Sequence, residues 1–419
     1  MVTRRRVVAV IRPAGISHQA SGSSVWLYRT VEPHPVRLVT RPFVLAVLAI
    51  FGVVLAIGML LPVLPVYAKG ELGAGSVGVG LAVAAASPTA LLFQPLAGRI
   101  GDRRGRRILV LLGPLIVAVS VAAYIFVDTL WALVLLRLVT GIGEGMIFVG
   151  AATVVTDLAP ERRRGEAVSL YSLGVWGGLA IGPVLGEVIL GRSGYDAVWL
   201  AAAASALFAA LAGVALTETR PVTAERAPPG RLLHPAAIGP GLVLISSAFG
   251  FAGFNAFVAL YARELGLGGA GWVFFVYSAI VVSIRIFGRR LPDRLGAKQA
   301  AGTALGLLAA GLLTIGLWNE PLGLYVGTAI FAVGTALAFP ALMTLAVDRA
   351  EVSERSSVIG TFSACIDLGF ALGALSLGGV AAVAGYEGVF VAGALFSLVG
   401  VVALTRIPTS LRVQAAQAS

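Results

Sequence analysis

Three ionisable side chains lie deep inside long apolar stretches of this sequence, namely Arg137, Glu144 and Asp367. A charge near the middle of a lipid bilayer costs roughly 2.5 to 3.5 kcal/mol on insertion scales, so each needs a partner, a water-filled cavity or a function. On a helix, Arg137, Gly141 and Glu144 share one face, with about 10 Å of rise between the two charged residues. This spacing favours an interaction between Arg137 and Glu144 but does not require a salt bridge.

Glu144 is the carboxylate best placed for proton chemistry. In a low-dielectric cavity a carboxyl group favours its neutral form, which lets it take up and release a proton. We expect Glu144 to be the main proton site, with Arg137 adjusting its proton affinity; the alternative is a permanent structural pair. Asp367 is a second titratable site, an anchor for a cationic group, or a structural partner of Arg285, which otherwise extends toward the aqueous interface.

The composition indicates that lipid surrounds these residues. Of the 419 residues, 58% are hydrophobic and 12% are charged, against roughly 25% charged residues in soluble domains. The net charge of +11 does not indicate nucleic acid, because the basic residues stand in short loops between apolar runs. The three histidines fall in tail or loop segments and Cys365 is alone, so we expect no metal and no cofactor, and any proton chemistry must use carboxylates.

Twelve apolar stretches are long enough to cross a bilayer core of roughly 30 Å as helices. They lie near 43–66, 77–98, 107–127, 130–154, 167–190, 196–216, 240–262, 272–291, 300–318, 321–347, 356–383 and 386–405. Several features recur 191 positions apart, among them Asp102 and Asp293, or Gly194-Tyr195-Asp196 and Gly385-Tyr386-Glu387. The sequence therefore predicts an all-α membrane protein with twelve transmembrane helices in two pseudo-symmetric six-helix bundles.

Polar segments flank and join the two halves. We expect a disordered tail at 1–42, an N-terminal bundle at 43–217, a proline-rich linker at 218–239, a C-terminal bundle at 240–406 and a tail at 407–419. Lys and Arg concentrate in the tails, the linker and alternate loops, which places both termini in the cytoplasm under the positive-inside rule. The expected location is the cell's inner (plasma) membrane, and the expected state is a monomer.

Three motifs resemble those of the major facilitator superfamily, over about residues 43 to 405. The first resembles the family's loop motif between its second and third helices, with Gly98, Asp102, Arg103, Gly105, Arg106 and Arg107 in place. Its second copy has Asp293, Arg294, Gly296 and Lys298, with Arg289 and Ala297 as departures. The stretch from Arg137 to Gly143 is similar to an arginine motif linked to proton coupling. Gly178, Gly182, Pro183 and Gly186 resemble the motif of drug:proton antiporters, with Glu187 in place of its final glycine.

Each loop carries an Asp that can accept hydrogen bonds at a helix N-terminus. We expect Asp102 to reach the helix start near 353–356 and Asp293 the one near 164–166, which clamps the two halves together; the alternative is a solvated basic loop that sets topology alone. Gly178, Gly182 and Gly186 lie on one helix face and permit close helix approach, while Pro183 can bend the helix. A purely structural kink is the alternative reading of that motif.

Few buried amides are present, Asn255 and Gln94 being the clear ones. Because an unmet hydrogen bond costs roughly 1 to 3 kcal/mol, the substrate should be amphipathic or apolar rather than a sugar. The expected cavity residues are Asn255, Trp176, Phe251, Phe254, Tyr277 and Phe339, although plain packing is an alternative for the aromatic ones. The resemblance implies proton-coupled efflux of a small molecule by alternating access, with protons and lipid as the other partners. An uptake symporter and a non-transporting sensor are the alternatives; no signature of an enzyme is present.

Overall fold

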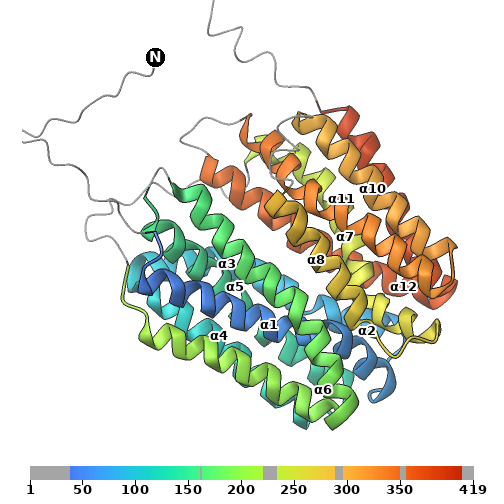
Figure 1. The fold of residues 1–419 in the computed structure, drawn as a ribbon, viewed down its shortest axis with the longest axis horizontal. Helices are drawn as coiled ribbons and strands as arrows, with labels where there is room; N and C mark the ends of the chain where they lie inside the picture. Colours follow the sequence, from blue (N-terminus) through green and yellow to red (C-terminus); the bar gives the residue numbers. More distant parts are fainter. Residues whose placement is uncertain (1–37, 161–162, 220–233, 288–295, 350–354, 408–419) are drawn as a thin grey trace, which may run out of the picture.

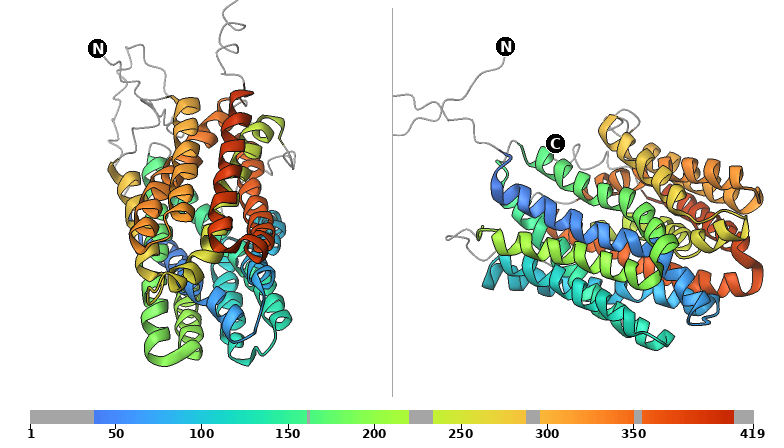
Figure 2. Two further views of the ribbon diagram at one scale, coloured as in Figure 1. Left: turned by 90° about the vertical axis from the view of Figure 1, so that its right-hand side faces the viewer. Right: turned by 60° about the horizontal axis from the view of Figure 1, so that its bottom comes forward.

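A computed structural model describes residues 38–160, 163–219, 234–287, 296–349 and 355–407. Every regular element within these ranges is helical. Figure 1 shows the blue-to-green helices gathered on one side of the molecule and the yellow-to-red helices on the other. Figure 2 shows from two further directions that the helices of both groups run alongside one another. The architecture is therefore the predicted all-α one, built of two helical halves.

In its described residues the N-terminal half contains six numbered α-helices and one short 3-10 helix. They are α1 (Arg41–Gly70), α2 (Ser76–Ala84), α3 (Ala86–Arg104), α4 (Arg107–Ala122), η1 (Ala123–Phe126), α5 (Leu130–Leu158) and α6 (Arg164–Ala215). The break between α2 and α3 follows from the sequence, because Pro88 has no N–H to donate to the carbonyl of Ala84. The expected second span is thus two helical segments that meet at Ala85.

The C-terminal half contains α7 (Pro235–Glu264), α8 (Gly271–Phe287), α10 (Ala297–Leu317), α11 (Pro321–Val347) and α12 (Arg355–Thr405). The start of α7 corrects the predicted linker, which was expected to extend to residue 239. Pro235 occupies the first helical turn, and the His234 ring Nδ1 accepts a hydrogen bond of 3.2 Å from the backbone N–H of Ala236. This proline and cap start the helix five residues before the apolar run near 240.

Nine helical stretches within the described residues are long and apolar enough to cross a membrane, and α8 is a shorter apolar helix of 17 residues. Two of the nine stretches each contain two helices. The α6 stretch is two helices joined across Gly194, at φ 77° and ψ −175°, and α12 is two helices joined across Gly385, at φ 70° and ψ −174°. Twelve membrane crossings stay a prediction, since the count depends on how these joined helices and α8 meet the bilayer.

The repeated features adopt the same conformations in both halves. Gly194 and Gly385, 191 positions apart, form nearly identical turns. Gly105 and Gly296 have the same offset, and both have positive φ, at 104° and 79°. A positive φ is accessible to glycine at little cost, so the duplication extends from the sequence to the backbone.

Packing is most extensive within each half, where α1 lies against α6, α4 against α5, α7 against α12, and α10 against α11. The halves meet where α2 and α3 contact α12 and where α6 contacts α8. Large apolar side chains stay exposed on the outer faces, among them Phe126, Phe287 and Val383. Such surface is unfavourable in water and suits contact with lipid chains.

Candidate functional site

Arg137 lies on α5 and is held by the end of a neighbouring helix. Its Nε donates to the carbonyl of Ala82 at 3.3 Å and its Nη2 to the carbonyl of Val83 at 3.4 Å. These carbonyls belong to the last turn of α2, where the helix dipole favours a positive charge. Two backbone carbonyls next to the junction of α2 and α3 therefore hold the buried guanidinium in place.

Glu144 lies two turns along the same face of α5 and forms an ion pair with Arg137. Glu144 Oε1 is 3.7 Å from Arg137 Nη1, and the two side chains are 15% and 10% exposed. Within the described residues this Oε1 accepts no hydrogen bond. The pair that the spacing left open is thus formed, but it is long, and the buried carboxylate has spare acceptor capacity.

Asp367 on α12 meets the N-terminal half at this site. Gln94 Nε2, on α3, donates a 2.9 Å hydrogen bond to Asp367 Oδ2, and the charge of Glu144 acts electrostatically on Asp367. The three residues predicted for proton coupling thus form one group at the contact between the halves. Sequence reasoning identified Gln94 as a buried amide but did not pair it with Asp367.

Arg285 takes neither of the two roles expected for it. It is not the partner of Asp367, which binds Gln94, and it does not simply extend into solvent. Its guanidinium carbon lies 4.9 Å from the ring centroid of Trp176, and its Nε is buried. Because Trp176 belongs to α6 and Arg285 to α8, this cation–π contact also crosses between the halves.

The residues predicted to line a substrate cavity fall into two environments. Phe254 and Tyr277 are fully buried and pack against Phe331, with centroid separations of 5.1 and 5.9 Å. Asn255 is buried and donates to the carbonyl of Phe251 on its own helix at 2.7 Å. Phe254 and Asn255 are thus packed within the C-terminal half, whereas Tyr277 also contacts Trp176 of the N-terminal half.

Trp176, Phe251 and Phe339 are only half-buried. Phe339 pairs with Phe362 at 5.5 Å. One pocket of about 450 Å³ lies elsewhere, at the turn near Gly194, and its lining includes Tyr67, Glu71, Asp128 and Asp196. A substrate role for the predicted cavity residues therefore stays a prediction.

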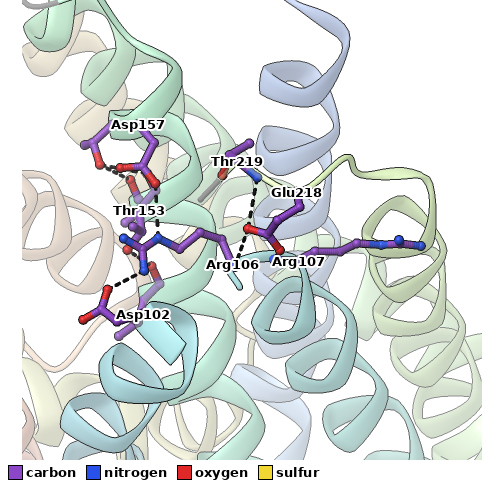
Figure 3. Close-up of polar contacts among 10 residues, drawn as sticks. Asp102, Arg106, Arg107, Thr153, Asp157, Glu218 and Thr219 are labelled. Atoms are coloured by element: carbon purple, nitrogen blue, oxygen red, sulfur yellow. Dashed lines mark hydrogen bonds and ion pairs between the residues drawn. The ribbon is translucent and has the colours of Figure 1, made fainter. Parts of the chain in front are cut away.

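The loop between α3 and α4 forms a compact polar network, drawn in Figure 3. Arg106 points toward two carboxylates, with Nη1 at 2.5 Å from Asp102 Oδ1 and Nε at 3.1 Å from Asp157 Oδ2. Glu218 accepts hydrogen bonds from the backbone N–H groups of Arg106 and Arg107 at 2.8 and 3.2 Å. None of these contacts involves the C-terminal half, because Asp157 lies in the last turn of α5 and Glu218 is the first residue of the predicted linker after α6.

The predicted clamp between the halves falls largely outside the described residues. Asp293 and Arg294 lie there, as do residues 353 and 354 of the helix start expected to receive Asp102. Arg103 is exposed at the end of α3 and Gly98 has open space around it. The clamp therefore stays a prediction, and the described contact of Asp102 is with Arg106.

Arg107 and Lys298, 191 positions apart, make equivalent contacts. Arg107 Nη2 donates to the carbonyl of Val214 at 2.7 Å, and Lys298 Nζ donates to the carbonyl of Thr405 at 3.3 Å. Val214 and Thr405 are also 191 positions apart, and each lies at the C-terminal end of the last helix of its half. These two cations satisfy helix-end carbonyls and favour the helix dipole.

Gly178, Gly182 and Gly186 line a close contact between α6 and α1. A Cβ at Gly178 would lie 2.7 Å from the backbone nitrogen of Leu55, and one at Gly182 would lie 2.7 Å from the Cα of Gly58. A Cβ at Gly186 would meet the backbone of Met59 in the same way. The backbone keeps helical angles at Pro183, since the non-helical residue of α6 is Gly194.

Glu187 directly follows Gly186 and caps the start of α8. Its carboxylate accepts hydrogen bonds from the backbone N–H of Ala270 and, at 2.5 Å, from that of Gly271. A Cβ at Gly269 or Gly271 would collide with the carboxylate. Sequence reasoning noted Glu187 only as a departure from the motif, although the Gly268–Gly271 run was a visible signal for close backbone approach.

A second contact joins the halves at the same end of the molecule. Lys69, in the last turn of α1, donates a hydrogen bond to the hydroxyl of Tyr386 and lies 4.8 Å from the centroid of its ring. Nearby, a Cβ at Gly378 of α12 would lie 2.9 Å from the carbonyl oxygen of Ser76 in α2. The halves are thus held together at the end where α1 finishes and α8 begins.

Comparison with known proteins places these features in a family. The model of the Major Facilitator Superfamily matches twice, over residues 46–268 and 241–418. An uncharacterised MFS-type transporter of Salmonella typhimurium is 29% identical over 362 residues, covering 84% of this chain and 92% of its own. One of Burkholderia mallei is 28% identical over 362 residues, covering 83% and 87%.

Two solved structures share the fold. The human organic anion transporter MFSD10 has a TM-score of 0.66 at 23% identity, covering 87% of this chain and 99% of its own. A variant of the nucleoside transporter NupG has a TM-score of 0.70 at 16% identity, covering 88% and 100%. At these identities the likeness concerns the fold alone.

Proposed function

The chain belongs to the major facilitator superfamily, and on that premise we propose that it exports a small amphipathic molecule in exchange for protons by alternating access. It is a multi-pass membrane protein of a transporter family. The proposal adds the proton coupling, the direction of transport, twelve crossings of the inner (plasma) membrane and the cytoplasmic location of both termini.

The group formed by Arg137, Glu144, Asp367 and Gln94 carries this proposal. Two carboxylates from different halves interact electrostatically where the halves meet. Like charges in a low-dielectric site resist being ionised together, so a proton binding at one changes the energy of the other. A proton can therefore alter the contact between the halves, which is what coupling to alternating access requires.

Glu144 receives the proton at Oε1, the buried oxygen without a hydrogen-bond donor. Protonation removes its attraction to Arg137, which keeps its bonds to the α2 carbonyls. The remaining step is rocking of the halves. It requires release of the Glu187 cap on α8 and of the Lys69 contact with Tyr386, because both hold one end closed.

Two observations favour export of an amphipathic molecule over uptake of a sugar. The glycine seam between α6 and α1 is similar to the antiporter motif, and both buried amides are already engaged, Asn255 with its own helix and Gln94 with Asp367. Replacing the hydration shell of a sugar needs many free hydrogen-bonding groups. The half-buried Trp176 and Phe251 rings instead suit an apolar molecule.

Flux in proteoliposomes under an imposed pH gradient tests the proposal. Purified protein is reconstituted, and the movement of a panel of amphipathic solutes is followed with the proton gradient in either direction. We expect solute to move against the protons, Glu144→Gln to abolish the dependence on the gradient, and Glu71→Gln, an exposed carboxylate at the end of α1, to preserve it. Gradient-driven flux that survives in Glu144→Gln contradicts proton coupling at this residue. Solute moving with the protons indicates a symporter, and binding without flux indicates a sensor.

A further inference from the structure

Arg285 carries a positive charge at the interface between the halves without a counter-charge among the described residues. One face of its guanidinium lies over Trp176, at 4.9 Å from the ring centroid. Its buried Nε has no hydrogen-bond partner in the part of the chain that the structure describes. A guanidinium offers five donors in its plane, so stacking on a ring and burial of Nε still leave the Nη donors of this partly exposed side chain for a ligand. These donors suit a group with two acceptor oxygens.

An aromatic row leads away from Arg285. Trp176 and Tyr277 have ring centroids 6.5 Å apart, Tyr277 and Phe251 are 6.0 Å apart, and Phe251 and Phe370 are 6.0 Å apart. Four helices contribute one ring each, namely α6, α8, α7 and α12. Trp176, Phe251 and Phe370 are half-buried, so part of each ring is left uncovered. The row therefore offers apolar surface beside a single cation.

The acidic group at the other end of the row is already bonded. Asp367 lies one turn before Phe370 on α12, and its carboxylate accepts the hydrogen bond from Gln94. The Gln94 bond engages one oxygen of that carboxylate, whereas Arg285 donates no hydrogen bond in the part of the chain that the structure describes, so an anionic group is attracted to Arg285 and repelled by Asp367. The charge pattern thus orients a ligand with its anionic group at Arg285 and its apolar part along the rings.

We propose that Arg285 binds the anionic group of the transported molecule, a carboxylate or sulfonate, while its apolar body lies along Trp176, Phe251 and Phe370. This rests on the proposed transport function and names the class of its substrate as amphipathic anions. If the Arg285–Trp176 contact only stabilises the packing of α8 against α6, the prediction differs. Losing it would then lower stability and leave the preference for the ligand's charge unchanged.

Three probes of matched size test this assignment, namely naphthalenesulfonate, the neutral naphthalenesulfonamide and the cationic naphthylmethylammonium. Their binding to detergent-purified protein is measured by calorimetry. We expect the sulfonate to bind about tenfold more tightly than the sulfonamide, as one charge-assisted contact predicts. Arg285→Gln should remove that preference, Arg285→Lys should retain part of it, and Arg192→Gln, at an exposed site, should leave it intact.

The sulfonate binding no better than the sulfonamide, the cation binding best, or an anion preference that survives in Arg285→Gln would each overturn the assignment. If Arg285→Gln fails to fold, Arg285→Lys decides. A sulfonate preference in Arg285→Lys equal to that of the wild type shows that the guanidinium is not the group that binds the anion. Binding in detergent needs no proton gradient. An anion preference without gradient-driven flux would therefore support this site while contradicting proton coupling. Gradient-driven flux without an anion preference would support proton coupling while contradicting this site.

Discussion

Gln94 of the N-terminal half donates a 2.9 Å hydrogen bond to Asp367 of the C-terminal half, although the two residues are 273 positions apart. The contact joins α3 to α12 beside the Arg137–Glu144 pair. A carboxylate removed from water needs such donors, because an unsatisfied buried group costs more than the bond itself contributes. The hydrogen bond between the halves is thus part of the same polar group as the proposed proton site.

Replacing Gln94 with Leu should lower the apparent melting temperature of the purified protein, because Asp367 loses its donor at a cost of roughly 1 to 3 kcal/mol. The double variant Gln94→Leu with Asp367→Leu should recover most of the loss, since no buried polar group is left without a partner. Melting followed by intrinsic fluorescence gives the comparison. Losses that simply add in the double variant would contradict the contact.

Removing the Glu187 carboxylate should favour opening at the end where α8 begins. Glu187→Ala deletes two charge-assisted hydrogen bonds to the α8 backbone, each worth roughly 1.5 to 3 kcal/mol. Spin labels on Glu71 and Val383, exposed and in different halves, report the opening in a Cys365→Ser background. We expect longer distances between the labels in Glu187→Ala. Glu264→Ala, which removes an exposed carboxylate at the end of α7, should leave the distances unchanged. Unchanged distances would show that the cap does not hold this end closed.

The two glycines of the α3–α4 motif should respond differently to alanine. Gly105 has φ 104°, and a Cβ there would collide with the Glu218 carboxylate, so Gly105→Ala should cost more than about 1 kcal/mol. Gly98 lies within α3 with open space around it, so Gly98→Ala should be neutral or stabilising. Apparent melting temperatures of the two variants provide the measurement. Equal effects would rule out this network as the reason for the motif.

Adjacent glycines of α6 provide a matched pair for the seam with α1. A Cβ at Gly178 would lie 2.7 Å from the Leu55 nitrogen, whereas one at Gly177 would make an ordinary contact at 3.5 Å with the Phe51 ring. Gly178→Ala should therefore destabilise the protein by about 1 to 3 kcal/mol, as overpacking does, and Gly177→Ala should not. The order of the two melting temperatures tests this, and a reversed order would refute close packing at Gly178.

Local patterns in the sequence predicted much of the fold. Apolar run lengths located the helices, and the 191-residue offset predicted equivalences that the Gly194 and Gly385 turns display in their backbone angles. Helical spacing brought Arg137 and Glu144 to one face, where they form an ion pair. These features depend on residues within one or two helical turns or on repetition, which a single sequence contains.

Contacts between distant helices could not be predicted in this way. Pairing with Arg285 was one of the alternatives for Asp367, and Gln94 was not paired with it, because which side chains meet between the halves depends on the rotation and depth of α3, α8 and α12. The start of α7 was placed too late because hydropathy does not report the His234 cap. Glu187 was missed because a helix cap supplied from another helix leaves no periodic signal.

The turns at Gly194 and Gly385 contain one non-helical residue each, so no loop separates the two helices that each turn joins. Each pair of joined helices must then tilt as one rigid unit, so a displacement at its open end is transmitted to the turn. Inserting a flexible Gly-Ser segment there would uncouple the two arms while leaving every side chain of the proposed proton site in place.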